Sequence, residues 1–221
     1  MPARWSSRRL PGKVAAIIGG QSMLERVWRA TVAAPGFARV LVATDSPKVV
    51  QLARGFGADV ALTGPASSGT ARASLLAPDD VAVAVVQADQ PFLDPDHLGA
   101  LRDSVSRSPI GTLWSEWSGD PADLDRVKIR IEIDRVLDFA REPWPDAAPR
   151  RHVGMYAFRP GWLGRCTQGP PTARAIRHDL EQLSWLDQGF EMAAHHVSGV
   201  GPSVDTWPQL VRARARMAES T

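Results

Sequence analysis

VAVAVVQADQP, residues 81–91, is the longest continuous apolar run of the chain and decides its predicted fold. A strand that is apolar on both faces is typical of a parallel sheet covered by helices on each side. We therefore expect residues 81–91 to form a central strand. The run ends near Asp89, and ligands of open α/β sheets bind outside the carboxyl ends of the strands.

Strand and helix patterns alternate along the chain on both sides of this run. Short links connect them, and several helices begin at a capping residue such as Ser46 or Asp94. The alternation predicts an α/β fold with a doubly wound, mostly parallel sheet. Apart from the central run, the expected elements are strand 38–45, helix 46–57, strand 58–64, helix 94–107, strand 152–158, helix 175–189, strand 191–197 and helix 206–220.

Residues 127–133 depart from this pattern because apolar and polar side chains alternate strictly there. The spacing predicts a half-exposed strand that pairs with residues 136–141 as a hairpin. We expect a single domain over residues 1–221, with a hairpin region inserted at about 125–150. Inserted antiparallel strands often form a subunit contact or a lid, so a homodimer is one of the arrangements that the hairpin allows.

The bulk composition excludes several classes of protein. The chain is 44% hydrophobic and 23% charged, an ordinary globular balance, and its net charge of +2 gives little support to a nucleic-acid partner. Cys166 is the only cysteine, so no disulfide can form within the chain. No apolar run approaches the ~20 residues of a membrane span. We expect a cytoplasmic protein with no nucleic-acid or membrane partner.

RWSSRRLPGK, residues 4–13, is the first stretch that carries chemistry. Arg4, Arg8, Arg9 and Lys13 lie in a loop-like segment with two serines and a Pro-Gly turn pair. Clustered cations and free backbone N–H groups are what a triphosphate requires. This cationic loop therefore predicts a phosphate site.

Two carboxylates and one small polar loop could complete such a site. Asp89 and Asp205 could hold Mg²⁺, which prefers one or two carboxylates plus substrate oxygens. The alternatives are a turn residue for Asp89 and a helix-capping carboxylate for Asp205. Ser68, followed by a Gly-Thr pair and Arg72, could offer donors to a phosphate or a base, although most such loops are turns.

The later part of the chain offers weaker candidates. His152 and Tyr156 lie on the same face of one predicted strand, but a lone histidine is more often structural than catalytic. Glu181 and Gln182 lie in a predicted helix, where a solvated face is the simpler interpretation.

Taken in order, these stretches resemble the 3-deoxy-manno-octulosonate cytidylyltransferase family, and the likeness spans almost the whole chain. The order of many motifs is more specific than any single one. The stretches that carry the resemblance are PAR and RLPGK at 2–4 and 9–13, ATD at 43–45, SSGTAR at 67–72, QADQP at 87–91, AREPWP at 140–145, RHVGMYAFR at 151–159, LEQLS at 180–184 and SVDTWPQL at 203–210.

The resemblance implies a reaction in which a sugar-acid hydroxyl attacks the α-phosphorus of CTP and yields a CMP-sugar and pyrophosphate. Mg²⁺ is the implied cofactor, and lipopolysaccharide biosynthesis is the implied setting. Arg4 and Lys13 are implied to bind the triphosphate, with Ser7 and Arg9 nearby. The remaining implied roles are the nucleotide for Ser68, Arg72 and Gln87, the metal for Asp89 and Asp205, and the acidic sugar for Arg141, His152, Tyr156, Glu181 and Gln182.

Three of the chain's departures from the family pattern bear on the candidate site. The apolar strand that the family has before the cationic loop is missing from the sequence as given, because the loop begins almost at Met1; either the true start lies further upstream, which we favour, or the fold is altered. Gln90 and Ala71 stand where the family has carboxylates. Two alternatives stay open for these reasons: a catalytically impaired nucleotide-binding relative, or a cytidylyltransferase for another ulosonic acid or a phosphonate.

Overall fold

The apolar run at residues 81–91 forms only a short strand, β5 (Val83–Val85), in the computed structural model. β5 pairs with one neighbour and occupies an edge of its sheet, so the expectation of a central strand is wrong. Val86 and Ala88 are nevertheless buried, because the chain leaves the sheet and packs into a loop. The apolar residues of this run therefore mark a buried loop as well as a strand, and their number does not predict how long the strand is.

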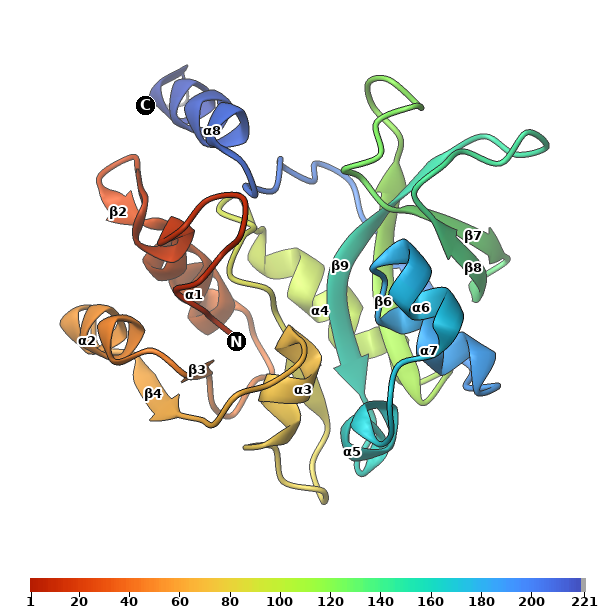
Figure 1. Ribbon diagram of the computed structural model, residues 1–221, viewed down its shortest axis with the longest axis horizontal. Coiled ribbons are helices and arrows are strands. Elements are labelled where there is room, and N and C mark those ends of the chain that lie inside the picture. Colours follow the sequence, from red (N-terminus) through yellow and green to blue (C-terminus); the bar gives the residue numbers. More distant parts are fainter. Residues whose placement is uncertain (220–221) are drawn as a thin grey trace. The chain divides into compact units, whose positions relative to one another are not determined.

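The structure describes residues 1–219, and the chain divides into two compact units, coloured along the sequence in Figure 1. Unit 1 contains residues 1–76 and 85–99 together with the segment that starts at residue 200. Unit 2 contains residues 77–84 and 100–199. Among residues 1–219, no helix has the length and apolar character needed to cross a bilayer. The expectation of a single domain stays a prediction.

Unit 1 is built from short elements around two small sheets. One sheet pairs β1 with β2 in antiparallel fashion, and the other pairs β3 with β4 in parallel. Its elements are the 3-10 helix η1 (Lys13–Ala15), β1 (Ile17–Ile18), β2 (Gln21–Ser22), α1 (Met23–Ala33), β3 (Leu41–Thr44), α2 (Pro47–Gly55), β4 (Asp59–Leu62), α3 (Gly69–Ser74) and α8 (Trp207–Glu219), with the first turns of α4 (Pro95–Ser104).

The segment before the cationic loop is short but paired. No strand precedes η1 among the elements of residues 1–219, and the absence of the first family strand stays a prediction. Pro2 forms an isolated parallel bridge with Ala43. The Ala3 N–H donates to the Ala43 carbonyl at 2.9 Å, and the Ala43 N–H donates to the Met1 carbonyl at 2.9 Å. These bonds fasten the start of the cationic loop to β3.

Unit 2 is organised by a six-stranded sheet in the order β5-β9-β6-β10-β8-β7. β6 pairs with β10 in parallel and with β9 in antiparallel, while β7 and β8 form the predicted hairpin. The α/β class is therefore confirmed, with a mixed sheet where a mostly parallel one was expected. Its other elements are β6 (Ile110–Glu116), β7 (Lys128–Glu132), β8 (Arg135–Ala140), β9 (Arg150–Phe158), α5 (Trp162–Thr167), α6 (Ala173–His178), α7 (Gln182–Asp187) and β10 (Met192–His196).

The helix predicted at residues 175–189 is in fact two helices. α6 ends at His178, and Asp179 adopts a left-handed conformation with φ 52° before α7 starts at Gln182. Aspartate tolerates this conformation better than most residues do. The break makes Glu181 the N-cap and the buried Gln182 the first residue of a new helix.

Candidate functional site

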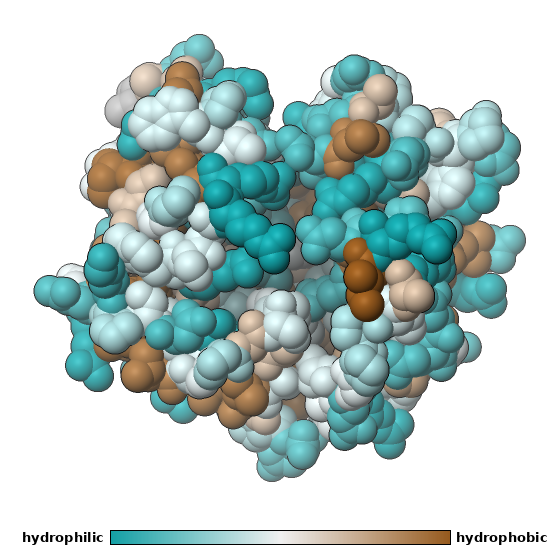
Figure 2. All heavy atoms as spheres, in the orientation of Figure 1, coloured by the Kyte–Doolittle hydropathy of each residue, from teal (hydrophilic) through white to brown (hydrophobic). Residues whose placement is uncertain are grey.

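The cationic loop closes on itself before it reaches Lys13. The Trp5 carbonyl accepts hydrogen bonds from Ser7 N–H at 3.0 Å and from Gly12 N–H at 2.9 Å. Gly12 has φ 70°, and a Cβ there would lie 3.3 Å from the Trp5 ring, so glycine suits this turn. Arg4 and Arg9 are exposed, whereas Ser7 is buried. Figure 2 shows hydrophilic side chains gathered over this part of unit 1.

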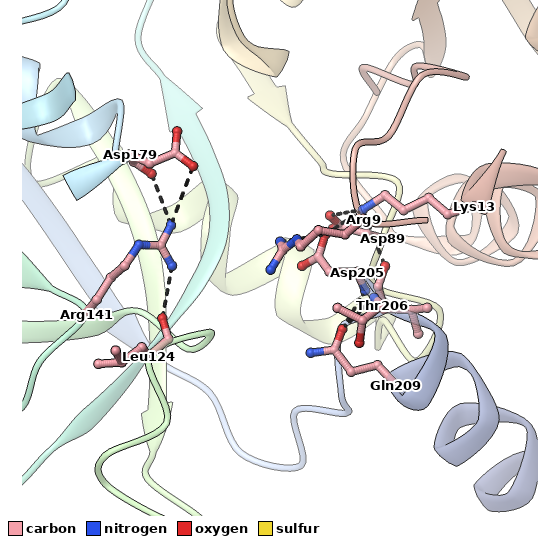
Figure 3. Close-up of polar contacts among 10 residues, drawn as sticks. Arg9, Lys13, Asp89, Leu124, Arg141, Asp179, Asp205, Thr206 and Gln209 are labelled. Atoms are coloured by element: carbon pink, nitrogen blue, oxygen red, sulfur yellow. Dashed lines mark hydrogen bonds and ion pairs between the residues drawn. The ribbon is translucent and has the colours of Figure 1, made fainter. Parts of the chain in front are cut away.

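Lys13 lies between the two aspartates that the sequence singles out (Figure 3). Its Nζ donates to Asp89 Oδ2 at 2.9 Å, to Asp205 Oδ1 at 2.8 Å and to the Val204 carbonyl at 3.3 Å. Arg9 lies 3.2 Å from the same Asp205 oxygen. The Lys13 side chain is 11% exposed and each carboxylate is 26% exposed. Residues from three distant parts of the sequence thus meet around one ammonium group.

The pKa values of this cluster reflect mutual stabilisation of charge. Burial alone lowers the pKa of Lys13, but Asp89 and Asp205 outweigh burial and raise it above its ordinary value. Burial alone raises the pKa of Asp205, but Lys13, then Arg9 and Arg4, outweigh burial and lower it. Lys13 and Asp205 are both charged at neutral pH as a result.

The donor set around Lys13 fits Mg²⁺. Oxygens of Asp89 and Asp205 converge on one positive charge, and two carboxylates with substrate oxygens are a typical magnesium environment. Within the described residues, no group of three or more His, Cys, Asp and Glu side chains is placed to hold a metal. Any magnesium at Asp89 and Asp205 would therefore take further ligands from substrate or water.

The backbone around Asp205 is held by Gln209, which sequence reasoning missed. Gln209 Oε1 accepts hydrogen bonds from the backbone N–H groups of Asp205 at 2.7 Å and Thr206 at 3.0 Å. The sequence does contain a pattern that predicts this contact. Thr206 at the N-cap followed three residues later by Gln209 is a capping box. Val204 N–H also donates to the Asp89 carbonyl at 2.9 Å, which links the two carboxylate-bearing segments.

The residues expected near the nucleotide lie at the start of α3. Ser68 caps α3 by accepting a hydrogen bond from the N–H of Ala71 at 3.0 Å. The amide of Gln87 packs against Gly69 so closely that a Cβ there would lie 2.9 Å from Gln87 Oε1. Ser68 and Gln87, far apart in sequence, are therefore brought to the same loop.

Arg72 is buried beneath this loop and supports it. Its side chain is 4% exposed and bonds to Asp45 Oδ2 at 2.6 Å, to Thr63 Oγ1 at 2.5 Å and to the Gly64 carbonyl at 3.2 Å. Arg72 thus ties α3 to the ends of β3 and β4. Its role near the nucleotide stays a prediction, and these contacts make it a support of the loop.

Asp45→Ala is expected to lower the free energy of unfolding by about 3 kcal/mol, because it leaves the Arg72 guanidinium buried without its charged partner. Urea unfolding measures this loss. The matched control is Asp59→Ala, which removes an exposed pair with Arg39 and should change stability by less than ~0.5 kcal/mol. Equal effects of the two substitutions would contradict this account of Arg72.

In unit 2, His152 is held as a neutral imidazole. Burial, and secondarily Arg151, lowers the pKa of His152 to about 3. Its Nε2 lies 2.9 Å from Thr112 Oγ1, and that hydroxyl donates its proton to the Met155 carbonyl at 2.8 Å. His152 Nε2 must therefore carry the hydrogen, which leaves Nδ1 as the acceptor of the ring.

Tyr156 lies beside His152 among aromatic rings. The two ring centroids are 5.6 Å apart, and the Trp185 ring meets Tyr156 edge-on at 4.8 Å. Burial, with the charge of Glu181, raises the pKa of Tyr156 well above its ordinary value, so its hydroxyl remains protonated. The two strand residues and the start of α7 are thus brought together.

Arg141 is fastened to the backbone at the other end of β8. Its guanidinium donates to the carbonyls of His178 at 2.9 Å, Leu124 at 3.1 Å and Asp179 at 3.2 Å, as Figure 3 shows in part. Its own carbonyl accepts a bond from the buried Lys128 ammonium. Arg141 also lies 4.0 Å from the Asp179 carboxylate, so the guanidinium is held by backbone carbonyls and by one charged partner.

Comparison with known proteins gives one consistent family. A cytidylyltransferase family model matches residues 1–110. The 3-deoxy-manno-octulosonate cytidylyltransferase of Synechococcus elongatus is 38% identical over 97% of this chain and 95% of that protein. The protein of the same name from Escherichia coli is 31% identical over 99% of this chain and 95% of its own length.

Solved structures agree with the sequence comparison. A CMP:2-keto-3-deoxy-manno-octonic acid synthetase complexed with CTP superposes with a TM-score of 0.91 at 31% identity, and covers 100% of this chain and 97% of that chain. The 4-diphosphocytidyl-2C-methyl-D-erythritol synthase of Anaerococcus prevotii matches over 93% of both chains with a TM-score of 0.64 at 11% identity, a likeness of fold alone. With relatives of this similarity over nearly its full length, the chain belongs to the 3-deoxy-manno-octulosonate cytidylyltransferase family.

Proposed function

We propose that the protein transfers a cytidylyl group from CTP to 3-deoxy-manno-octulosonate (KDO), giving CMP-KDO and pyrophosphate. The observation that carries the proposal is the convergence of Lys13, Asp89 and Asp205 beside the cationic loop. It is supported by the names of relatives that share 31–38% identity with this chain over nearly its whole length.

In the proposed reaction, a hydroxyl oxygen of the sugar acid attacks the α-phosphorus of CTP. A new P–O bond forms, the bond from the α-phosphorus to the bridging oxygen breaks, and pyrophosphate leaves while the hydroxyl proton passes to solvent. Reactions of this type depend on positioning and on the neutralisation of charge on the phosphate oxygens. We assign that neutralisation to Arg4, Arg9 and Lys13, with Ser7 beside them in the loop.

Asp89 and Asp205 are the proposed ligands of Mg²⁺. When bound there, the ion would neutralise phosphate charge and lower the pKa of a coordinated sugar hydroxyl. Their side chains are one-quarter exposed, which leaves them accessible to a nucleotide and its metal. Ser68, Arg72 and Gln87 are proposed to surround the nucleotide, with Arg72 acting through its support of the α3 loop.

We assign the sugar acid to unit 2. The Arg141 guanidinium can pair with the sugar's carboxylate, as guanidinium groups often do, in exchange for its long 4.0 Å contact with the exposed Asp179 carboxylate. Neutral His152 offers Nδ1 as an acceptor, and the protonated Tyr156 hydroxyl can act as a donor. Glu181 and Gln182 at the start of α7 are proposed to bind the sugar hydroxyls.

Pyrophosphate release tests the proposal. The protein is incubated with CTP, Mg²⁺ and a panel of acceptors that contains KDO, other ulosonic acids and a phosphonate. KDO is expected to give the fastest release, and omission of the acceptor should abolish it. Faster release with another acceptor would correct the substrate. Binding of CTP in calorimetry without release for any acceptor would replace the proposal by a non-catalytic nucleotide-binding protein.

A further inference from the structure

Gly201 lies where the chain has no room for a side chain. It is buried, and a Cβ built on it would lie 2.3 Å from Phe92 Cβ and 2.9 Å from Phe92 Cγ. Gly201 is not among the residues with positive φ, so its backbone would accept any residue. Glycine is therefore required at residue 201 because residue 92 approaches too closely to leave space for a side chain.

This approach joins the two segments that carry the carboxylates. Phe92 follows Asp89 by three residues, and Gly201 precedes Asp205 by four. Between these points, Val204 N–H donates to the Asp89 carbonyl at 2.9 Å. The segments are parts of unit 1 and run against each other from the glycine contact to the aspartates.

A buried hydrophobic cluster lies next to this contact. Val204 is fully buried in a cluster with Ile18, Met23, Leu210 and Ala213, and Phe92 packs against the same cluster. Because the nearest atom belongs to Phe92 Cβ and not to the ring, a new methyl group at residue 201 cannot be absorbed by a shift of the Phe92 ring alone. The atom it meets first is the Phe92 Cβ, which moves only with the backbone.

We propose that Gly201 is a positioning residue, which sets Asp205 beside Asp89 by letting the two segments touch at Phe92. The proposal deepens the proposed function and rests on it, because the positioned carboxylates are the proposed metal ligands. An alanine at residue 201 must move one segment by about 1 Å to reach ordinary contact. Magnesium holds its oxygen ligands within a narrow range near 2.1 Å, so such a shift removes one carboxylate from reach.

The experiment measures binding of Mn²⁺, as a paramagnetic probe for Mg²⁺, to the full-length protein in the presence of CTP. Gly201→Ala is expected to weaken Mn²⁺ binding at least tenfold while the protein remains folded by circular dichroism. The matched control is Gly99→Ala in α4, where an added Cβ meets nothing within 4 Å. That control should change Mn²⁺ affinity by less than twofold.

A double-mutant cycle separates positioning from general loss of stability. Phe92→Gly removes the Cβ that obstructs a side chain at residue 201, although it also removes the ring. In this background, Gly201→Ala is expected to weaken Mn²⁺ binding less than threefold. A similar loss in both backgrounds, or unchanged affinity in Gly201→Ala alone, would overturn the proposal while leaving the metal site intact. Failure of the unsubstituted protein to bind Mn²⁺ would overturn both the metal role and the positioning role.

Discussion

Asp89→Asn is expected to reduce pyrophosphate release from CTP and KDO by about a thousandfold, equivalent to ~4 kcal/mol in the barrier. Asparagine keeps the size of the side chain but removes its charge. The proposed metal ligand then becomes a weak one, and charge at the α-phosphorus is neutralised less well in the transition state. Initial rates at saturating Mg²⁺ and both substrates measure the effect.

The control for this prediction must leave the site unchanged. Asp80→Asn makes the same chemical change at an exposed position in unit 2 and should retain the full rate. Binding of CTP without metal should survive in Asp89→Asn, since the cations of the loop are unaltered. Turnover within threefold of the unsubstituted enzyme would refute the metal role of Asp89.

Lys13→Met is expected to reduce kcat/KM for CTP by about a hundredfold, through loss of a cation that stabilises the triphosphate in the transition state. The same substitution is expected to strengthen metal binding. In the structure, the Lys13 ammonium occupies the space between Asp89 and Asp205, where it competes with a metal for the same oxygens. Mn²⁺ binding without nucleotide should therefore be tighter in Lys13→Met than in the unsubstituted protein.

The same substitution gives a pH-dependent effect on stability. Because the pKa of Asp205 is lowered by folding, its charged form stabilises the native state above pH ~4, and this contribution disappears as the pH falls through the lowered pKa. The raised pKa of Lys13 makes its contribution present below pH ~10.5 and lost above it. The pair of Lys13 and Asp205 therefore stabilises the native state between about pH 4 and pH 10.5.

Urea unfolding at several pH values tests this window. At pH 7 we expect Lys13→Met to be less stable than the unsubstituted protein by about 2 kcal/mol, since it leaves two neighbouring carboxylates without their shared partner. The difference should shrink as the pH falls below ~4. A difference that stays constant from pH 3 to pH 7 would show that lost packing, and not charge, is the cause.

Several residues of the candidate site could be singled out from the sequence because their chemistry lies in short stretches. Lys13, Asp89 and Asp205 were singled out from the cationic loop and from their places beside predicted strands and helices, and the structure places all three in contact. What sequence could not give is the contact itself. Lys13 and Asp205 are 192 residues apart, and no local pattern reports such a distance.

The fold could be predicted where periodicity matched burial. Apolar and polar residues alternate in the sequence of the β7–β8 hairpin, and its predicted pairing is confirmed, although Lys128 is buried and Ile133 is exposed against the pattern. β6 was missed because Ile110, Gly111, Thr112 and Leu113 are all buried, so no alternation marks the strand. The helix α1 was missed although Ser22 accepts a bond from Glu25 N–H, a capping pattern that the sequence does contain.

The errors at residues 81–91 and 175–189 have a common cause. In both stretches several apolar residues are buried as expected, whereas Val81 and Ile176 are exposed, and the backbone that carries them is irregular. Val86 and Ala88 pack from a loop, and Asp179 interrupts a helical pattern that would otherwise continue through Leu183. Hydrophobicity predicts which side chains are inside, whereas the conformation depends on contacts made by distant residues.

The segmented construction of unit 1 has a consequence for how the protein is made. Its core cluster joins Ile18 and Met23, near the beginning of the chain, to Val204, Leu210 and Ala213, which are translated after the whole of unit 2. Contacts of such sequence separation form slowly, since a long loop must close before they are gained. On the ribosome, the N-terminal segments must therefore wait, with part of their apolar surface uncovered, until α8 emerges. Since Asp205 arrives with α8, completion of this core and assembly of the carboxylate pair are expected to occur in a single late step of folding.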